Sequence, residues 1–225
     1  MATIVFDLDG TLVDTAADLI ASLNCIAVEA GLEPFGDDHK TYLVGQGSRI
    51  MIARAFALRD CSLAEDDLDR LHAKFVQHYS AGMPGQSVEY DGVDEALDRL
   101  AANGCRFAVC TNKDEALAVT LLDKLGLRHR FEVVTGGDTF AFKKPDGRHI
   151  LQTIAKVGGV PERSVMVGDS RNDVMAAKNA AVPSICVTFG YSDVPVSQLS
   201  PDGTISHFSE LTLEFLDKLI TERIG

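Results

Sequence analysis

The sequence predicts an α/β protein with a doubly wound parallel sheet (Rossmann-like) core and an inserted all-helical cap domain. Short apolar runs alternate with helical patterns from about residue 84 onward, as in parallel strands joined by crossover helices. The later runs are apolar at nearly every position, as in strands buried on both faces. Between the first strand and this region only helical patterns occur, which indicates the insertion.

Each element follows from its apolar periodicity and its stop signals. The run at residues 3–6 is apolar and β-branched, and turn residues follow it at once. Helical patterns carry apolar residues three and four positions apart and end at glycines such as Gly31, Gly104 and Gly126. The expected strands are 3–6, 106–110, 131–134, 164–167, 184–188 and 204–206, and the expected helices are 14–31, 37–45, 48–58, 64–80, 92–103, 113–125, 146–157 and 172–180.

Two domains follow from this order of elements. Residues 1–13 and 84–225 form the predicted α/β catalytic core, and residues 14–83 form the predicted helical cap. A stretch that contains glycine and proline, residues 82–85, marks the return to the core.

Composition excludes some classes of partner. The 225 residues carry 21 Lys and Arg against 33 Asp and Glu, a net charge of −12, and a field of that sign repels nucleic acid and anionic membranes. The five cysteines are odd in number and lack metal-ligand spacing, which indicates reduced thiols. With no apolar run of ~20 residues and no signal peptide, a cytoplasmic location is expected. Oligomeric state is not readable from the sequence.

Acidic turn residues come directly after the first strand. Asp7, Asp9 and Gly10 lie in the run DLDGTLVD, where an open α/β sheet places its ligand site. Two carboxylates this close repel each other unless a divalent cation or a shared proton holds them. A polar surface turn is the alternative, which the length of the motif and the buried strand before it disfavour.

Three further motifs lie at the same expected edge. Thr111-Asn112-Lys113 follows the strand 106–110 and suits anion binding, although a helix cap by Thr111 or Asn112 is the favoured explanation when the motif is taken alone. Lys143-Lys144-Pro145-Asp146 offers a fixed positive charge, or two solvated lysines. Gly168-Asp169-Ser170-Arg171-Asn172-Asp173 follows the strand 164–167 and supplies carboxylates that suit Mg²⁺, or acidic groups at a helix start.

These motifs together resemble the haloacid dehalogenase-like hydrolase superfamily over essentially the whole chain. All four of its motifs occur in order, as DLDGTLVDT, the Thr of CTNK, the Lys of KKP, and GDSRND. Within the superfamily the segments at 44–49 and 188–191 resemble the phosphoglycolate phosphatase group. Two positions depart from the usual pattern, since Gly147 replaces a second proline and Asp91-Gly92 replaces Pro-Gly.

The resemblance implies a Mg²⁺-dependent phosphatase that acts on a small phosphorylated metabolite, 2-phosphoglycolate, through a phosphorylated aspartate. Asp7 is then the nucleophile, and Asp9 is the acid for the leaving oxygen and later the base for water. The phosphate is held by Thr111, Asn112 and Lys144. Mg²⁺ is bound by Asp7, the carbonyl of Asp9, Asp169 and, directly or through water, Asp173. In the cap, Gly45, Gly47 and Arg49 are weaker candidates for substrate contacts.

Other activities remain open at this point. Pyrophosphatases, nucleotidases and sugar phosphatases have similar sequences, and the cap chooses among their substrates. A β-phosphoglucomutase-like isomerase is the alternative from another class, although such relatives usually carry Val at the position of Thr11. A dehalogenase lacks the second carboxylate that is present here as Asp9, and a non-catalytic relative is expected to have lost at least one of Asp7, Asp9, Lys144 or Asp169.

Overall fold

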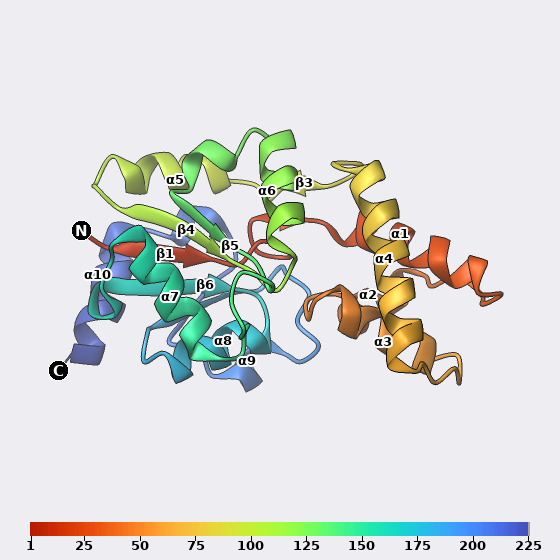
Figure 1. Ribbon diagram of the computed structural model, residues 1–225. Helices are drawn as coiled ribbons and strands as arrows, with labels where there is room; N and C mark the ends of the chain where they lie inside the picture. The colour runs from red at the N-terminus through yellow and green to blue at the C-terminus, as the bar shows by residue number, and fades with distance from the viewer. Residues whose placement is uncertain (225) are drawn as a thin grey trace.

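A six-stranded parallel sheet forms the centre of the computed structural model, which describes residues 1–224 (Figure 1). The order is β5-β4-β1-β6-β7-β8, so the first strand lies in the middle and the chain winds outward from it in both directions. The predicted doubly wound α/β fold is confirmed. The strands are β1 (Thr3–Phe6), β4 (Arg106–Cys110), β5 (Val133–Thr135), β6 (Ser164–Gly168), β7 (Ser184–Val187) and β8 (Gly203–Ile205).

Helices cover both faces of this sheet. Successive residues of β1 point to opposite faces, so Ile4 and Phe6 join one apolar cluster and Val5 joins the other. The Val5 cluster takes Ile150 and Ile154 from α7, and α7 and α8 lie on that side of the sheet (Figure 1). The core helices are α5 (Val93–Ala101), α6 (Glu115–Lys124), α7 (Gly147–Val157), α8 (Arg171–Asn179), α9 (Val196–Leu199) and α10 (Leu213–Ile224).

Four further helices pack together beyond the carboxyl ends of the strands (Figure 1). They are α1 (Ala16–Glu29), α2 (Lys40–Leu43), α3 (Ser48–Ala57) and α4 (Glu65–Gly82). Leu23 of α1, Ile52 and Phe56 of α3, and Phe75 and Tyr79 of α4 are all buried in their common interior. Burying side chains of this size stabilises the packing by about 1.5–3 kcal/mol each. These helices therefore form a layer above the edge where the motifs of the sheet end.

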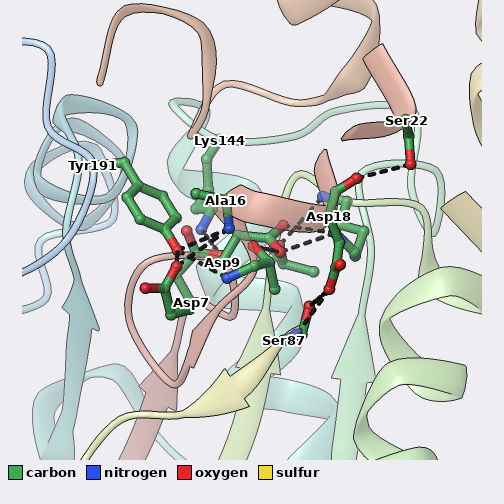
Figure 2. A network of polar contacts seen from close by, with 12 residues as sticks. Asp7, Asp9, Ala16, Asp18, Ser22, Ser87, Lys144 and Tyr191 are labelled. Atoms are coloured by element: carbon green, nitrogen blue, oxygen red, sulfur yellow. Dashed lines mark hydrogen bonds and ion pairs between the residues drawn. The ribbon is translucent and has the colours of Figure 1, made fainter. Parts of the chain in front are cut away.

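The two chain segments that join the helical layer to the sheet are tied to each other. The strand β2 (Val13–Asp14) pairs antiparallel with β3 (Val88–Glu89). One turn further on, the Asp18 carboxylate accepts hydrogen bonds from the amide of Gln86 and from the amide and hydroxyl of Ser87 (Figure 2). The division at residues 13/14 and 83/84 stays a prediction, and this small sheet lies across it.

Differences from the expected elements have local causes. The expected helix 37–45 is a 3-10 turn, Asp37–His39, followed by the short α2, and it stops at Val44, whose backbone is extended. The strand expected at 131–134 is shifted to Val133–Thr135. The sequence reasoning missed β2, β3, α9 and α10. Two-residue strands have no periodicity to detect, whereas α10 buries Leu216 and Ile220 and carries a helical pattern.

The described residues include no helix with both the length and the apolar character needed to cross a bilayer.

His149 of α7 is a histidine of the protein core. Its side chain is fully buried against the ring of Phe140. Neither ring nitrogen finds a hydrogen-bond partner among the described residues. Burial, and then the positive charge of Lys144, lower the pKa of His149 to about 4. The folded protein therefore holds this imidazole neutral at any pH above that value.

We expect His149 to make the protein less stable in mild acid. Because its folded pKa lies below the ordinary value of 6.5, the unfolded chain binds the proton first, and stability falls as the pH drops from 6.5 towards 4. From pH 7 to pH 5 the loss is roughly 2 kcal/mol of the free energy of unfolding. Urea unfolding at both pH values measures it, and the loss is expected to shrink by this amount in His149→Leu.

The matched control is His129→Leu, which removes an exposed histidine. If wild type and His149→Leu lose the same free energy between pH 7 and pH 5, buried His149 is not the source of the acid sensitivity.

Candidate active site

The register of the parallel strands brings the predicted motifs together. Phe6 of β1 lies opposite Val109 of β4 on one side and Val167 of β6 on the other. One or two residues beyond these partners, the chain reaches Asp7, Thr111 and Asp169 at the same edge. The amide of Asp7 also donates a hydrogen bond to the carbonyl of Val167. Segments that are far apart in sequence therefore meet at the carboxyl ends of three adjacent strands.

Three buried carboxylates form the centre of the site. Asp7, Asp169 and Asp173 each offer a carboxylate oxygen, and these oxygens lie within 4.8 Å of one another. Burial, opposed by the Lys144 charge and reinforced by Asp173 and Asp9, raises the pKa of Asp7 to about 6. Burial and the neighbouring Asp173 and Asp7 raise the pKa of Asp169 well above its ordinary value. The protein alone therefore leaves this cluster short of positive charge.

Lys144 is the cation within the cluster. Its ammonium group is buried and lies 2.9 Å from Oδ1 of Asp7 and 2.6 Å from Oδ1 of Asp173. Burial opposes its charge, but Asp173 and Asp7 outweigh that effect and raise the pKa of Lys144. Asn112 fixes the loop, since its side-chain amide donates to the Lys144 carbonyl at 2.9 Å. Lys144 is thus held charged beside Asp7 (Figure 2).

The donor set fits a small divalent cation such as Mg²⁺. Oxygen donors are what Mg²⁺ prefers, and Oδ1 of Asp169 is buried with no hydrogen-bond partner among the described residues. The other oxygen of Asp169 accepts from the amide of Tyr191 at 2.6 Å. Both oxygens of Asp173 already accept hydrogen bonds, from Lys144 on one side and from the amide and hydroxyl of Ser170 on the other. Asp7 and Asp169 therefore have the most capacity left for an ion.

Two glycines allow the chain to approach Asp169 this closely. A Cβ atom on Gly10 would stand 2.3 Å from Oδ2 of Asp169, and Gly10 has φ +79°, a conformation that favours glycine. A Cβ atom on Gly190 would stand 2.2 Å from the Cβ of Asp169. A side chain at either position would push this carboxylate out of place.

Asp9 faces away from the carboxylate cluster. Its Oδ1 accepts from the hydroxyl of Thr15 at 2.7 Å, and the ammonium of Lys113 donates to its two oxygens at 2.9 and 3.0 Å. A carboxyl group in this place can exchange a proton with a molecule that lies between it and Asp7.

A pocket separates the sheet edge from the helical layer above it. The space between its atoms, including the part that is open to solvent, is about 490 Å³. Its floor consists of Asp7, Asp9, Thr111, Asn112 and Lys113, and its roof includes Gly45, Gly47, Met51, Phe75 and Tyr79.

The predicted cap residues divide into two groups. Gly45 and Gly47 line the pocket, where the prediction places them. Arg49 is not among the lining residues, and its guanidinium is paired with Glu65 and Asp69 of α4 instead. In this structure Arg49 therefore connects α3 to α4.

The sequence reasoning missed two groups that the structure places at the site. Lys113 belongs to the motif Thr111-Asn112-Lys113, but the sequence analysis predicts no function for it. Tyr191 lies in the segment 188–191, for which the sequence analysis notes only a family resemblance. In the structure its hydroxyl donates to Asp14 and accepts from the amides of Thr15 and Ala16 (Figure 2). Tyr191 thereby connects the start of α1 to the segment that holds Asp169. No local signal reveals such a contact, because its partners are more than 170 residues apart.

The arrangement can perform displacement on a small anion. Asp7 is a carboxylate at the floor of the pocket, with one ammonium beside it and with the Asp169 and Asp173 oxygens close enough to share a divalent cation with it. Such charges offset the repulsion between an anionic substrate and a carboxylate nucleophile. Asp9 lies across the pocket floor and can act on the leaving group.

Comparison with known proteins gives consistent results. Residues 4–187 match the model of the family described as haloacid dehalogenase-like hydrolase. A phosphoglycolate phosphatase of Agrobacterium fabrum is 59% identical over 218 residues, which cover 97% of this chain and 94% of that protein. One from Mesorhizobium japonicum is 46% identical, with 96% of each chain covered. The crystal structure of a predicted phosphoglycolate phosphatase from Haemophilus somnus superposes with a TM-score of 0.86 at 29% identity, covering 94% of this chain and 96% of that one.

Removing the Lys144 cation is expected to destabilise the fold in a way that acid relieves. In Lys144→Met, Asp7 and Asp173 remain buried without their partner, which costs about 3–5 kcal/mol of the free energy of unfolding at pH 7. Without the cation the folded pKa of Asp7 lies even further above its unfolded value of 3.8. Protonation then favours the folded state, so stability recovers as the pH falls.

Urea unfolding of wild type and Lys144→Met at pH 7 and pH 5 measures this difference. Lys178→Met, on the exposed face of α8, is the control for loss of one lysine. A Lys144→Met protein as stable as wild type at pH 7 would contradict the assigned charge balance.

Proposed function

The chain belongs to the haloacid dehalogenase-like hydrolase family and is a phosphoric monoester hydrolase, and we propose that it hydrolyses 2-phosphoglycolate with Mg²⁺ as cofactor and Asp7 as nucleophile. The observation that carries this proposal is the placement of Asp7. It is a buried carboxylate on a pocket floor, 2.9 Å from the ammonium of Lys144 and within 4.8 Å of the Asp169 and Asp173 donors.

The first half of the proposed reaction transfers the phosphoryl group to the protein. An oxygen of Asp7 forms a bond to phosphorus while the bond from phosphorus to the ester oxygen breaks. Asp9 gives a proton to that leaving oxygen, so glycolate departs as a neutral alcohol at this end. Lys144, Thr111 and Asn112 hold the phosphoryl oxygens during the transfer.

The second half returns Asp7 to its free state. Asp9 takes a proton from water, the water oxygen bonds to phosphorus, and the bond between phosphorus and Asp7 breaks to release phosphate. Mg²⁺, held by Asp7, the carbonyl of Asp9, Asp169 and, directly or through water, Asp173, would supply positive charge to the phosphoryl oxygens. The helical layer limits access of bulk water to the pocket.

The choice of 2-phosphoglycolate rests on the relatives and on the pocket. Relatives at 59% and 46% identity carry that activity in their names and cover nearly the whole chain. A buried lysine, Lys113, lines the pocket, and it is distinct from Lys144 beside Asp7, which suits a substrate with a second anionic group. All five cysteines are free thiols, which supports a cytoplasmic location.

A panel of phosphate compounds tests the substrate and the metal together. We expect phosphate release from 2-phosphoglycolate to require Mg²⁺, to stop on chelation with EDTA, and to return when Mg²⁺ is added. The kcat/KM for 2-phosphoglycolate is expected to exceed the values for pyrophosphate, nucleoside monophosphates and sugar phosphates. A higher value for any of those would overturn the substrate, full activity in EDTA would overturn the cofactor, and a rearranged sugar phosphate would indicate the mutase.

Replacing the nucleophile tests the covalent route. Asp7→Asn keeps the shape of the side chain but cannot attack phosphorus, so kcat is expected to fall by about 10⁴-fold or more. Asp123→Asn, exposed on α6, is the control and retains full activity. Residual turnover of Asp7→Asn within about tenfold of wild type would exclude Asp7 as the nucleophile.

A further inference from the structure

Lys113 is a buried cation that takes no part in either of the two proposed chemical steps. Of the lysines that the structure describes, only Lys113 and Lys144 are buried. Lys144 lies within the carboxylate cluster, whereas Lys113 lines the pocket next to Asp9 and donates to both oxygens of that carboxylate. Burial opposes the charge of Lys113, but Asp9 and Tyr79 outweigh it and raise the pKa of Lys113. Lys113 is therefore a charged group at the pocket floor.

The position of Lys113 matches the chemistry of the leaving group. Asp9 must lie beside the oxygen that leaves with glycolate. In 2-phosphoglycolate a single methylene separates that oxygen from the carboxylate, which places the carboxylate oxygens about 3 Å from it, given bonds of ~1.5 Å. The Lys113 ammonium lies 2.9 Å from Asp9, so it lies within two hydrogen-bond lengths, about 6 Å, of where the leaving oxygen must be, and the carboxylate can extend from that oxygen towards it.

Tyr79 of α4 provides a second polar group at this place. It is 1% exposed and lines the pocket, and its hydroxyl makes no hydrogen bond that meets ordinary geometry with the described residues. A buried hydroxyl without such a bond is costly unless a ligand uses it. The Lys113 ammonium lies 4.5 Å from the centre of the Tyr79 ring, so the ring also holds the cation in place.

We propose that Lys113 and Tyr79 form the subsite that binds the carboxylate of 2-phosphoglycolate, with Lys113 held by Asp9 until the substrate arrives. The inference rests on the proposed function and adds the source of its selectivity. A carboxylate takes a charge-assisted hydrogen bond from the ammonium and a second bond from the phenol. A substrate without a carboxylate leaves both donors without that partner, which is how a polar site rejects an analogue.

The test compares 2-phosphoglycolate with ethyl phosphate, which has the same phosphate and lacks the carboxylate. The quantity measured is the ratio of the two kcat/KM values, because any effect of Lys113 on Asp9 acts on both substrates and cancels. We expect wild type to favour 2-phosphoglycolate by about 100-fold, and Lys113→Met to reduce this ratio by about 10–100-fold. Tyr79→Phe keeps the ring and is expected to reduce it by about 3–10-fold. Lys178→Met is the control and leaves the ratio unchanged.

A binding measurement makes the test independent of turnover. In the Asp7→Asn protein with Mg²⁺, titration calorimetry is expected to show about 10–100-fold weaker binding of 2-phosphoglycolate when Lys113→Met is added. Binding of ethyl phosphate is expected to change by less than about threefold. An unchanged ratio in Lys113→Met, with both substrates slowed equally, would overturn the subsite and leave Lys113 as a positioning residue for Asp9.

The two proposals fail in different ways. If wild type releases no phosphate from 2-phosphoglycolate, the proposed function is wrong. If wild type hydrolyses it and Lys113→Met keeps the full preference over ethyl phosphate, the subsite alone is wrong. Thermal unfolding establishes whether Lys113→Met is folded. Should it not fold, Tyr79→Phe decides, and an unchanged ratio in that variant would then overturn the subsite.

Discussion

The ammonium group of Lys144, buried between Asp7 and Asp173, is the interaction on which the rest of the site depends. Burying a carboxylate is costly unless a charge or hydrogen bonds compensate it, and here three carboxylates lie together. Against three negative charges Lys144 provides one positive charge, which leaves two negative charges. A divalent cation would balance them, and Oδ1 of Asp169 has no other partner among the described residues. Burial, and after it the neighbouring carboxylates, raise the pKa values of Asp7 and Asp169 despite the positive charge of Lys144.

The fold meets this constraint with contacts that come from several parts of the chain. The parallel register aligns the ends of β1, β4 and β6, so Asp7 and Asp169 come together without any long connection. Asn112 fixes the loop of Lys144, Ser170 orients Asp173, and Tyr191 holds both Asp169 and the first turn of α1. These supports position the charged groups before any substrate enters, as preorganised catalysis requires.

The residues that sequence reasoning placed well are those whose position follows from a nearby strand. Asp7, Thr111 and Asp169 each follow a buried apolar run, so the rule that ligand sites lie at the carboxyl ends of parallel strands was sufficient to predict that they meet at one edge.

The positions of Lys113, Tyr79 and Tyr191 could not be predicted in the same way. Their roles depend on how the helical layer packs on the sheet, and Tyr79 on α4 has the periodicity of an ordinary core residue. The same reason hid the pairing of β2 with β3, which is set by long-range contacts. Arg49 was predicted from its place close to Gly47 in the sequence, but its pairing with Asp69 and Glu65 depends on how α3 packs against α4, which the local sequence does not reveal.

The most direct test of this charge balance is to locate a cation in a crystal. Mn²⁺ replaces Mg²⁺ at sites of this chemistry and is visible by anomalous scattering. In crystals of the protein soaked with Mn²⁺, the account predicts one strong anomalous peak between Asp7 and Asp169, within about 2.2 Å of a carboxylate oxygen of each. Strong density for the ion elsewhere, with Asp169 still buried and empty of metal, would contradict it.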